Sequence, residues 1–523
     1  MQKSYSSNYL KIYSWKGLSI ILNMFSMFIV VPQLTSRPTV YGIYMLCVST
    51  AIFLSYADIG FVGAGFKYSA EYYAQGDLKN EIKMQGFCSF VLTVFVSLFF
   101  LLYLAASFYP GIIIKNLGNQ FEIGIASKLL LIQAIFSFTI VIARLNVIAF
   151  GIRLENYNLQ KILMIGYIIK ILSVFYFFRG IHYDIVGYFL FGKIVELVGG
   201  SIGFLYIKFK YHYSFRLFLR SFRFSKKIYY KTKQLALGSF YVTIMWILYY
   251  ELDSVAISKF LGAEALAYFA IGLTITRFFR TMFSVVYTPF VARFNHFVGL
   301  KNYEGLRKIY IKVINCTMPL IVFPVISVLI LRKSLVLSWV GSDYLVSVNI
   351  VLFLVLASIF AFINNPTSII IKALEKIKQL YLINTIMAIT YWLGIFITIK
   401  FWQVDSFAIF KFVTLFIAAI FYLIVSLNFL KMSFLQFFKK IILPFVFPAS
   451  FLIISLLIIE PFLPITKGKL NLLIVVLAGA IFSSLSLFLY YLLSKEFQLN
   501  MKNLFTDVFA NKSTIEKIRR QVG

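Results

Sequence analysis

Six basic side chains inside long apolar segments are the residues of this sequence whose type and placement point most clearly to chemistry. They are Arg144, Lys170, Lys193, Arg277, Arg280 and Lys411. If these segments cross a bilayer, each such charge costs at least about 2.5 kcal/mol at mid-membrane on insertion scales. A basic residue at that depth is therefore a candidate for binding an anionic group.

Arg277 and Arg280 are the strongest of these candidates. They are three positions apart, so on a helix they share a face. The polar stripe of this predicted helix comprises Thr274, Arg277, Thr281, Ser284 and Thr288. Guanidinium groups match phosphate oxygens in geometry, so the pair is suited to bind a diphosphate. An ion pair with an acid on another helix is the alternative.

Lys170, Lys193 and Arg144 are further candidates for substrate binding. Glu196 follows Lys193 by three residues, so an intrahelical ion pair competes with a ligand contact there. Arg144 lies near the end of its apolar segment, where the side chain can extend to lipid headgroups instead. The same explanation is favoured for Lys411.

Acidic residues inside the apolar segments are few. Asp58, Glu196 and Asp253 are candidates for ion coupling or gating. Asp58 suits either a coupling proton or an ion pair with a buried arginine. Asp253, with Glu251 two residues earlier, suits either an outer gate or an interfacial position.

The cysteines and histidines predict neither a metal site nor a disulfide framework. Three cysteines lie in apolar runs, and three histidines lie in or near loops at unrelated spacings. They are Cys47, Cys88, Cys316, His182, His212 and His296. We expect no catalytic residues among them.

The composition of the chain predicts which secondary-structure elements carry these residues. The chain has 523 residues, of which 61% are hydrophobic and 13% charged, with a mean hydropathy of +0.88. This composition excludes a soluble enzyme, a disordered chain and a secreted disulfide scaffold. It predicts an all-α polytopic membrane protein with about fourteen transmembrane helices of about 20 residues each. The net charge of +31 then indicates basic cytoplasmic loops or an anionic substrate, not nucleic acid.

The distribution of basic residues predicts the orientation. With the N-terminus inside, 34 of the 50 Lys and Arg residues fall on the cytoplasmic side and ten on the outer side. Both termini are then cytoplasmic. The largest loop, 208–233, carries nine basic residues and is expected to lie on anionic headgroups.

Two segments on either side of that loop suggest an internal repeat. Residues 41–80 start with Tyr41-Gly42-Ile43-Tyr44 and residues 268–302 start with Tyr268-Phe269-Ala270-Ile271, and both segments end in Leu-Lys-Asn. Each segment is predicted to comprise a short outer loop, a span and a basic inner loop, so both cross the membrane in the same direction. This pattern suggests two parallel repeats of six spans each. The predicted organisation is an N-terminal six-helix lobe at 1–207, a basic linker at 208–233, a second six-helix lobe at 234–430, two additional spans at 431–494 and a cytoplasmic tail at 495–523.

Five stretches of the sequence match the motifs of one known family. They are Tyr41-Gly42-Ile43-Tyr44, Tyr56-Ala57-Asp58-Ile59-Gly60-Phe61, Ala70-Glu71-Tyr72-Tyr73-Ala74-Gln75-Gly76-Asp77, Phe260-Leu261-Gly262-Ala263 and Trp339-Val340-Gly341-Ser342-Asp343-Tyr344. With these stretches the sequence resembles bacterial polysaccharide flippases of the O-antigen type, in the multidrug/oligosaccharidyl-lipid/polysaccharide (MOP) exporter superfamily. The resemblance implies two lobes that alternately open a central cavity to each side of the bacterial cytoplasmic membrane. It also implies that the protein needs no cofactor, and that glycosyltransferases and a glycan polymerase are its partners.

The resemblance and the charges together predict a transporter and not an enzyme. Its expected substrate is an undecaprenyl-diphosphate-linked oligosaccharide, with the lipid implied by the resemblance and the anionic preference by the basic residues. A multidrug exporter of the same fold is the first alternative, although a cationic drug would favour acids over bases. A membrane-embedded polysaccharide polymerase or lipid-sugar glycosyltransferase is the second, although no large outer loop is present to carry catalytic residues.

Overall fold

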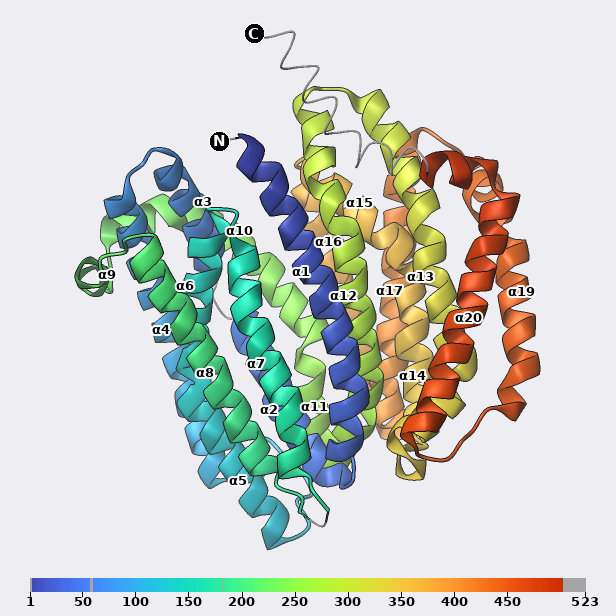
Figure 1. Ribbon diagram of the computed structural model, residues 1–523, viewed down its shortest axis with the longest axis horizontal. Coiled ribbons are helices and arrows are strands. Elements are labelled where there is room, and N and C mark those ends of the chain that lie inside the picture. Colours follow the sequence, from blue (N-terminus) through green and yellow to red (C-terminus); the bar gives the residue numbers. More distant parts are fainter. Residues whose placement is uncertain (1, 57–59, 181, 502–523) are drawn as a thin grey trace. The chain divides into compact units, whose positions relative to one another are not determined.

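The computed structural model describes residues 2–56, 60–180 and 182–501, and within them every regular element is a helix (Figure 1). The first eleven α-helices are α1 Gln2–Leu34, α2 Pro38–Tyr56, α3 Phe61–Ala74, α4 Leu78–Phe108, α5 Gln120–Ile135, α6 Thr139–Gly151, α7 Asn156–Phe177, α8 Ile185–Lys210, α9 Phe215–Ser221, α10 Lys226–Tyr250 and α11 Leu252–Phe260. The remaining nine are α12 Ala263–Gly299, α13 Tyr303–Val340, α14 Ser347–Leu356, α15 Ala361–Ala373, α16 Ile377–Trp402, α17 Val404–Leu430, α18 Phe434–Phe437, α19 Leu443–Ile459 and α20 Lys469–Leu493.

Among the described residues, twelve helical segments are long and apolar enough to cross a membrane, and the bent pair α10–α11 adds a thirteenth. The shorter apolar helix α2 falls at the second predicted span. These assignments agree with the predicted all-α fold of about fourteen spans. Several helices continue beyond the predicted apolar stretch, as α12 and α13 do, because their polar ends still satisfy backbone hydrogen bonds within the helix.

Contacts divide the chain into two compact units. Unit 1 contains residues 1–274 and 384–407, and unit 2 contains 275–383 and 408–523. The boundaries fall within α12, α16 and α17, so α10, α11 and most of α16 belong with the N-terminal helices. The lobe boundaries suggested by the sequence repeat stay a prediction.

Three helices in unit 1 that begin spans start at side-chain caps, which accept a hydrogen bond from the first helical turn. The caps of α4, α5 and α8 are Asp77, Asn119 and Asp184, with oxygen–nitrogen distances of 2.8–3.0 Å. An acidic cap also complements the positive end of the helix dipole. These polar positions end the short loops and fix where each span begins.

Glycines permit two close contacts in unit 1. A Cβ added at Gly42 in α2 would lie 1.8 Å from the carbonyl oxygen of Ala263, so only glycine fits there. A Cβ at Gly203 in α8 would lie 2.6 Å from the Asn146 side chain in α6. Asn146 in turn donates a hydrogen bond to the Gly200 carbonyl at 2.8 Å. Small residues thus bring α6 and α8 together, as they commonly do between membrane helices.

Candidate functional site

Lys170 of α7 and Lys193 of α8 lie beside the same carboxylate. The Nζ atoms of Lys170 and Lys193 are 3.6 Å and 3.5 Å from the Glu196 carboxylate oxygens. We call these three residues the Lys170 cluster. Its formal charge is positive, because two ammonium groups share one carboxylate.

Packing between α7 and α8 assembles the Lys170 cluster. Lys193 and Glu196 are three residues apart on α8, so they face the same side. The Lys170 side chain packs over Gly192 of α8, where an added Cβ would lie 2.9 Å from the lysine Cε. The missing side chain therefore lets Lys170 approach α8.

The Lys170 cluster is only partly buried. The Glu196 side chain is 47% exposed, against 27% for Lys170 and 10% for Lys193. The Lys193 Nζ also lies 5.3 Å from the centre of the Phe189 ring, an arrangement that favours the cation. The cluster can accept a further anionic group because its positive charge exceeds its negative charge and its carboxylate side is open.

Arg277 and Arg280 lie on α12, which carries a second set of polar residues. The stripe positions Thr274, Arg277, Thr281, Ser284 and Thr288 are partly buried or exposed. The opposite face is buried and includes Phe279 and Phe283, whose rings stack at 5.7 Å. The helix therefore has the amphipathic character that its sequence predicts. A role of the two arginines in substrate binding stays a prediction.

Arg144 and Asp58 are two further candidates from the sequence. Arg144 is partly buried on α6. Asp58 lies outside the described residues. Roles for these two residues stay predictions.

Asp253 lies at a broken span. Helices α10 and α11 meet at Glu251 with a bend of 42°. Glu251 and Asp253 are 1% and 0% exposed, and the Ser254 backbone N–H donates to the Asp253 carboxylate at 2.8 Å. Discontinuous helices commonly mark binding or coupling sites in transporters. A gating or coupling role of Asp253 stays a prediction.

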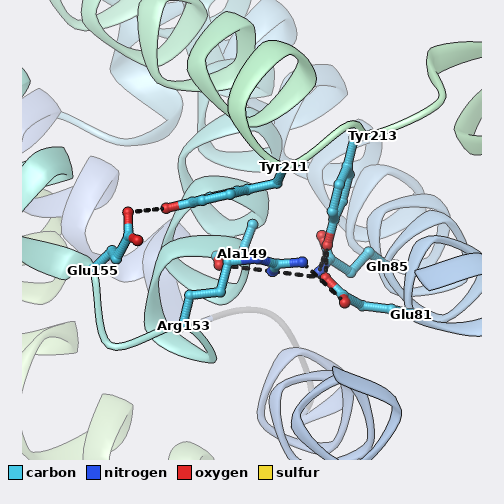
Figure 2. Close-up of polar contacts among 7 residues, drawn as sticks. All are labelled: Glu81, Gln85, Ala149, Arg153, Glu155, Tyr211 and Tyr213. Carbon is cyan, nitrogen blue, oxygen red and sulfur yellow. Dashed lines mark hydrogen bonds and ion pairs between the residues drawn. The ribbon is translucent and has the colours of Figure 1, made fainter. Parts of the chain in front are cut away.

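A third polar set, which the sequence did not single out, joins α4, the α6–α7 turn and the end of α8 (Figure 2). Its centre is a bidentate ion pair in which Arg153 donates to Glu81 at 2.8 Å and 3.1 Å. The two side chains are 7% and 1% exposed. The Tyr213 hydroxyl also donates to Glu81, and Gln85 donates to that hydroxyl at 2.7 Å.

Aromatic rings and a second carboxylate complete this set, which we call the Arg153 cluster. The guanidinium lies 4.7, 4.5 and 5.5 Å from the ring centres of Tyr73, Tyr211 and Tyr213. Tyr211 and Lys210 each donate to Glu155 at 2.7 Å. Burial would raise the pKa of Glu155, but these two hydrogen bonds outweigh it and lower that pKa. The cluster thus attaches the segment after α8 to α4 and to the α6–α7 turn.

Glu81 and Arg153 are 72 residues apart, and Glu81 and Tyr213 are 132 apart. No local spacing could reveal these contacts. The one available signal is Glu81 itself, an acid at the first turn of a long apolar helix.

Among the described residues, no group of three or more His, Cys, Asp or Glu side chains is placed to hold a metal ion. The three cysteines are buried and are not joined in disulfides. The arrangements described above bind or balance charge, and none combines an acid, base and nucleophile in the manner of a hydrolytic centre.

Neither protein-family profiles nor curated protein sequences match this chain. Solved structures do. The lipid II flippase MurJ in an inward closed conformation is similar over 92% of this chain and 98% of its own, with a TM-score of 0.69 and 17% identity.

Two further structures belong to transporters of the MOP superfamily. An inward-facing multidrug resistance MATE transporter matches 79% of this chain and 96% of its own, with a TM-score of 0.58 and 15% identity. A transporter from Pyrococcus furiosus, described as having a binding pocket of reverse polarity, matches 82% and 97%, with a TM-score of 0.52 and 14% identity. The chain therefore has the fold of MOP transporters.

Proposed function

We propose that this protein is a flippase that moves undecaprenyl-diphosphate-linked oligosaccharide repeat units from the cytoplasmic to the outer leaflet of a bacterial cytoplasmic membrane. The observation that carries the proposal is the Lys170 cluster, an excess of positive charge on membrane-spanning helices. A diphosphate supplies the anionic oxygens that such a cluster lacks. The likeness in fold to a lipid II flippase supports the same class of substrate.

In this proposal the basic residues hold the charged part of the substrate while its lipid tail stays in the bilayer. Lys170 and Lys193 contact the diphosphate or an acidic sugar, and Arg277, Arg280 and Arg144 contribute further positive charge. When no substrate is bound, Glu196 is the counter-ion of both lysines. Asp253 and Asp58 are assigned to gating or to coupling with an ion gradient.

Alternating access moves the substrate, with both termini on the cytoplasmic side. The 34 to 10 distribution of basic residues supports this orientation. Glycosyltransferases that build the repeat unit and a polymerase that joins exported units are the expected functional partners.

Depletion of the protein in its native bacterium tests the function. We expect complete single repeat units, still lipid-linked, to accumulate on the cytoplasmic leaflet. Unpolymerised units that are accessible from outside would instead assign the protein to an enzymatic step after flipping. Unchanged surface glycan with altered drug sensitivity would assign it to multidrug export, which the MATE-like fold also permits.

A further inference from the structure

The short helix α9 exposes apolar and basic side chains on adjacent faces. Phe215 and Leu219 are 46% and 54% exposed, and they are four residues apart on one side of the helix. Arg216 and Arg220 are exposed on the next side. Leu217 and Phe218 are partly buried and pack against the apolar cluster that includes Tyr213. α9 therefore has one face toward the protein and two faces away from it.

The exposed faces have a fixed direction because both ends of the segment are attached to unit 1. The Arg153 cluster holds Tyr211 and Tyr213, and Ser214 then caps α9 by accepting from the Leu217 N–H at 3.3 Å. At the other end, Ser221 packs so closely on α4 that a Cβ added at Gly86 would lie 2.8 Å from its Cβ.

The position of α9 in the chain places it at a membrane boundary. Its first residue follows the end of span α8 by five positions, and span α10 begins five positions after its last. The α9 label lies beside the ends of α4 and α8 in Figure 1. An exposed Phe–Leu face is unfavourable in water but stable at the boundary between acyl chains and headgroups.

The charge of the surrounding segment favours an anionic surface. Residues 208–233 contain nine Lys or Arg residues and no Asp or Glu. Arg223, Lys226 and Lys227 are exposed immediately after α9. A basic and apolar helix that connects two spans complements a bilayer with anionic headgroups better than it complements a soluble acidic partner, which would leave Phe215 and Leu219 without an apolar environment.

We propose that α9 is a bilayer-surface helix that inserts Phe215 and Leu219 at the headgroup boundary and binds anionic phospholipid phosphates through Arg216 and Arg220. The Arg153 cluster holds the helix at the angle that this contact requires. This inference is independent of which substrate the protein transports.

The test uses the full-length protein in nanodiscs of phosphatidylcholine alone or mixed equally with phosphatidylglycerol. The Leu219→Cys variant carries an environment-sensitive fluorophore, and the native cysteines are buried. Gln75→Cys, exposed in the turn before α4, is the matched control at the same end of unit 1. We expect the neutral quencher acrylamide to quench the label at 219 at least about threefold less than the label at 75 in the anionic nanodiscs, with a weaker difference in phosphatidylcholine.

The headgroup assignment is tested by adding Arg216→Gln and Arg220→Gln to the labelled variant. The lipid dependence of quenching should then be lost while the fluorescence of the Gln75→Cys control stays unchanged. Equal quenching at 219 and 75 in both nanodiscs would overturn the proposal. A lipid dependence that survives both arginine substitutions would overturn the assignment of the arginines to the headgroups.

Discussion

The Arg153 cluster and the Lys170 cluster are two ionic sets within unit 1 that differ in charge balance, geometry and burial. Arg153 and Glu81 form one cation–anion pair with bonds of 2.8 and 3.1 Å and exposures of 7% and 1%. Lys170 and Lys193 share Glu196 at 3.6 and 3.5 Å, and that carboxylate is 47% exposed.

This difference separates a structural ion pair from a site that can accept a ligand. The buried Arg153 guanidinium contacts a bidentate carboxylate and three tyrosine rings, all from the protein itself. It therefore holds α4, the α6–α7 turn and the segment after α8 together. Two ammonium groups around one accessible carboxylate retain positive charge and can exchange a long contact for a shorter one with phosphate. The contrast predicts stability effects in the first cluster and transport effects in the second.

The largest expected effect is on stability, from Glu81→Gln in the Arg153 cluster. The substitution leaves Arg153 buried beside a neutral partner, and loss of one member of a buried pair costs about 3–5 kcal/mol. Reversible denaturant unfolding in mixed micelles measures this loss.

A double variant provides the control for that experiment. Replacing the pair together, as Glu81→Leu with Arg153→Met, removes both charges and should cost less than Glu81→Gln alone. A single variant as stable as the unchanged protein would show that the pair does not hold the α4 and α6–α7 contacts.

The next largest effect is expected on substrate binding, from Lys170→Gln with Lys193→Gln. Loss of a charge-assisted hydrogen bond costs about 1.5–3 kcal/mol, so the Kd for a lipid-linked diphosphate sugar should rise about 10–100-fold. Equilibrium binding to the purified protein measures this change. The control is Lys400→Gln, at the exposed end of α16. It is the same lysine-to-glutamine change outside the Lys170 cluster, and it should leave the Kd unchanged.

A smaller effect of opposite sign is expected for Glu196→Gln. Removing the competing carboxylate leaves both lysines available to the ligand, so binding should tighten by about 1.5–5-fold, as the value of a partly exposed ion pair implies. Slower release should lower turnover. Weaker binding in this variant would mean that Glu196 positions the lysines and does not compete for them.

The smallest effect is expected at the edge of the Arg153 cluster, from Glu155→Gln. The lowered pKa of Glu155 means that its ion pair stabilises the fold above the ordinary glutamate pKa of about 4.3 and stops doing so as pH falls through the lower folded-state value. The Lys210 side chain is 45% exposed, so solvent limits the contribution to about 1 kcal/mol or less.

Unfolding at a series of pH values tests that sign. The unchanged protein should exceed Glu155→Gln in stability at pH 7, and the difference should disappear as the solution is acidified below about pH 4.3. A difference that grows on acidification would contradict the assignment of the charged form as the stabilising one.

The sequence predicted the parts of this molecule that depend on local pattern. Apolar runs of span length placed the helices. The three-residue spacing of Lys193 and Glu196 offered their ion pair as one of two alternatives, and the structure contains that pair. The sequence could not predict that Lys170 would join them, because that contact depends on how α7 packs over Gly192.

The Arg153 cluster could not be predicted from the sequence either, because it depends on tertiary packing even more than the Lys170 contact does. Its members come from four segments, and only the packed fold brings Tyr213 to Glu81. Arg153 was one more basic loop residue in the sequence, with nothing nearby to distinguish it from a headgroup anchor.

Transport by the reconstituted protein tests the central claim most directly. Proteoliposomes would contain a fluorescent polyprenyl-diphosphate oligosaccharide, with flipping followed by its accessibility to a membrane-impermeant quencher. The unchanged protein and Lys400→Gln should flip the lipid, and Lys170→Gln with Lys193→Gln should slow flipping about 10–100-fold at equal protein content. Full flipping by the double lysine variant would contradict the assignment of the Lys170 cluster to the substrate.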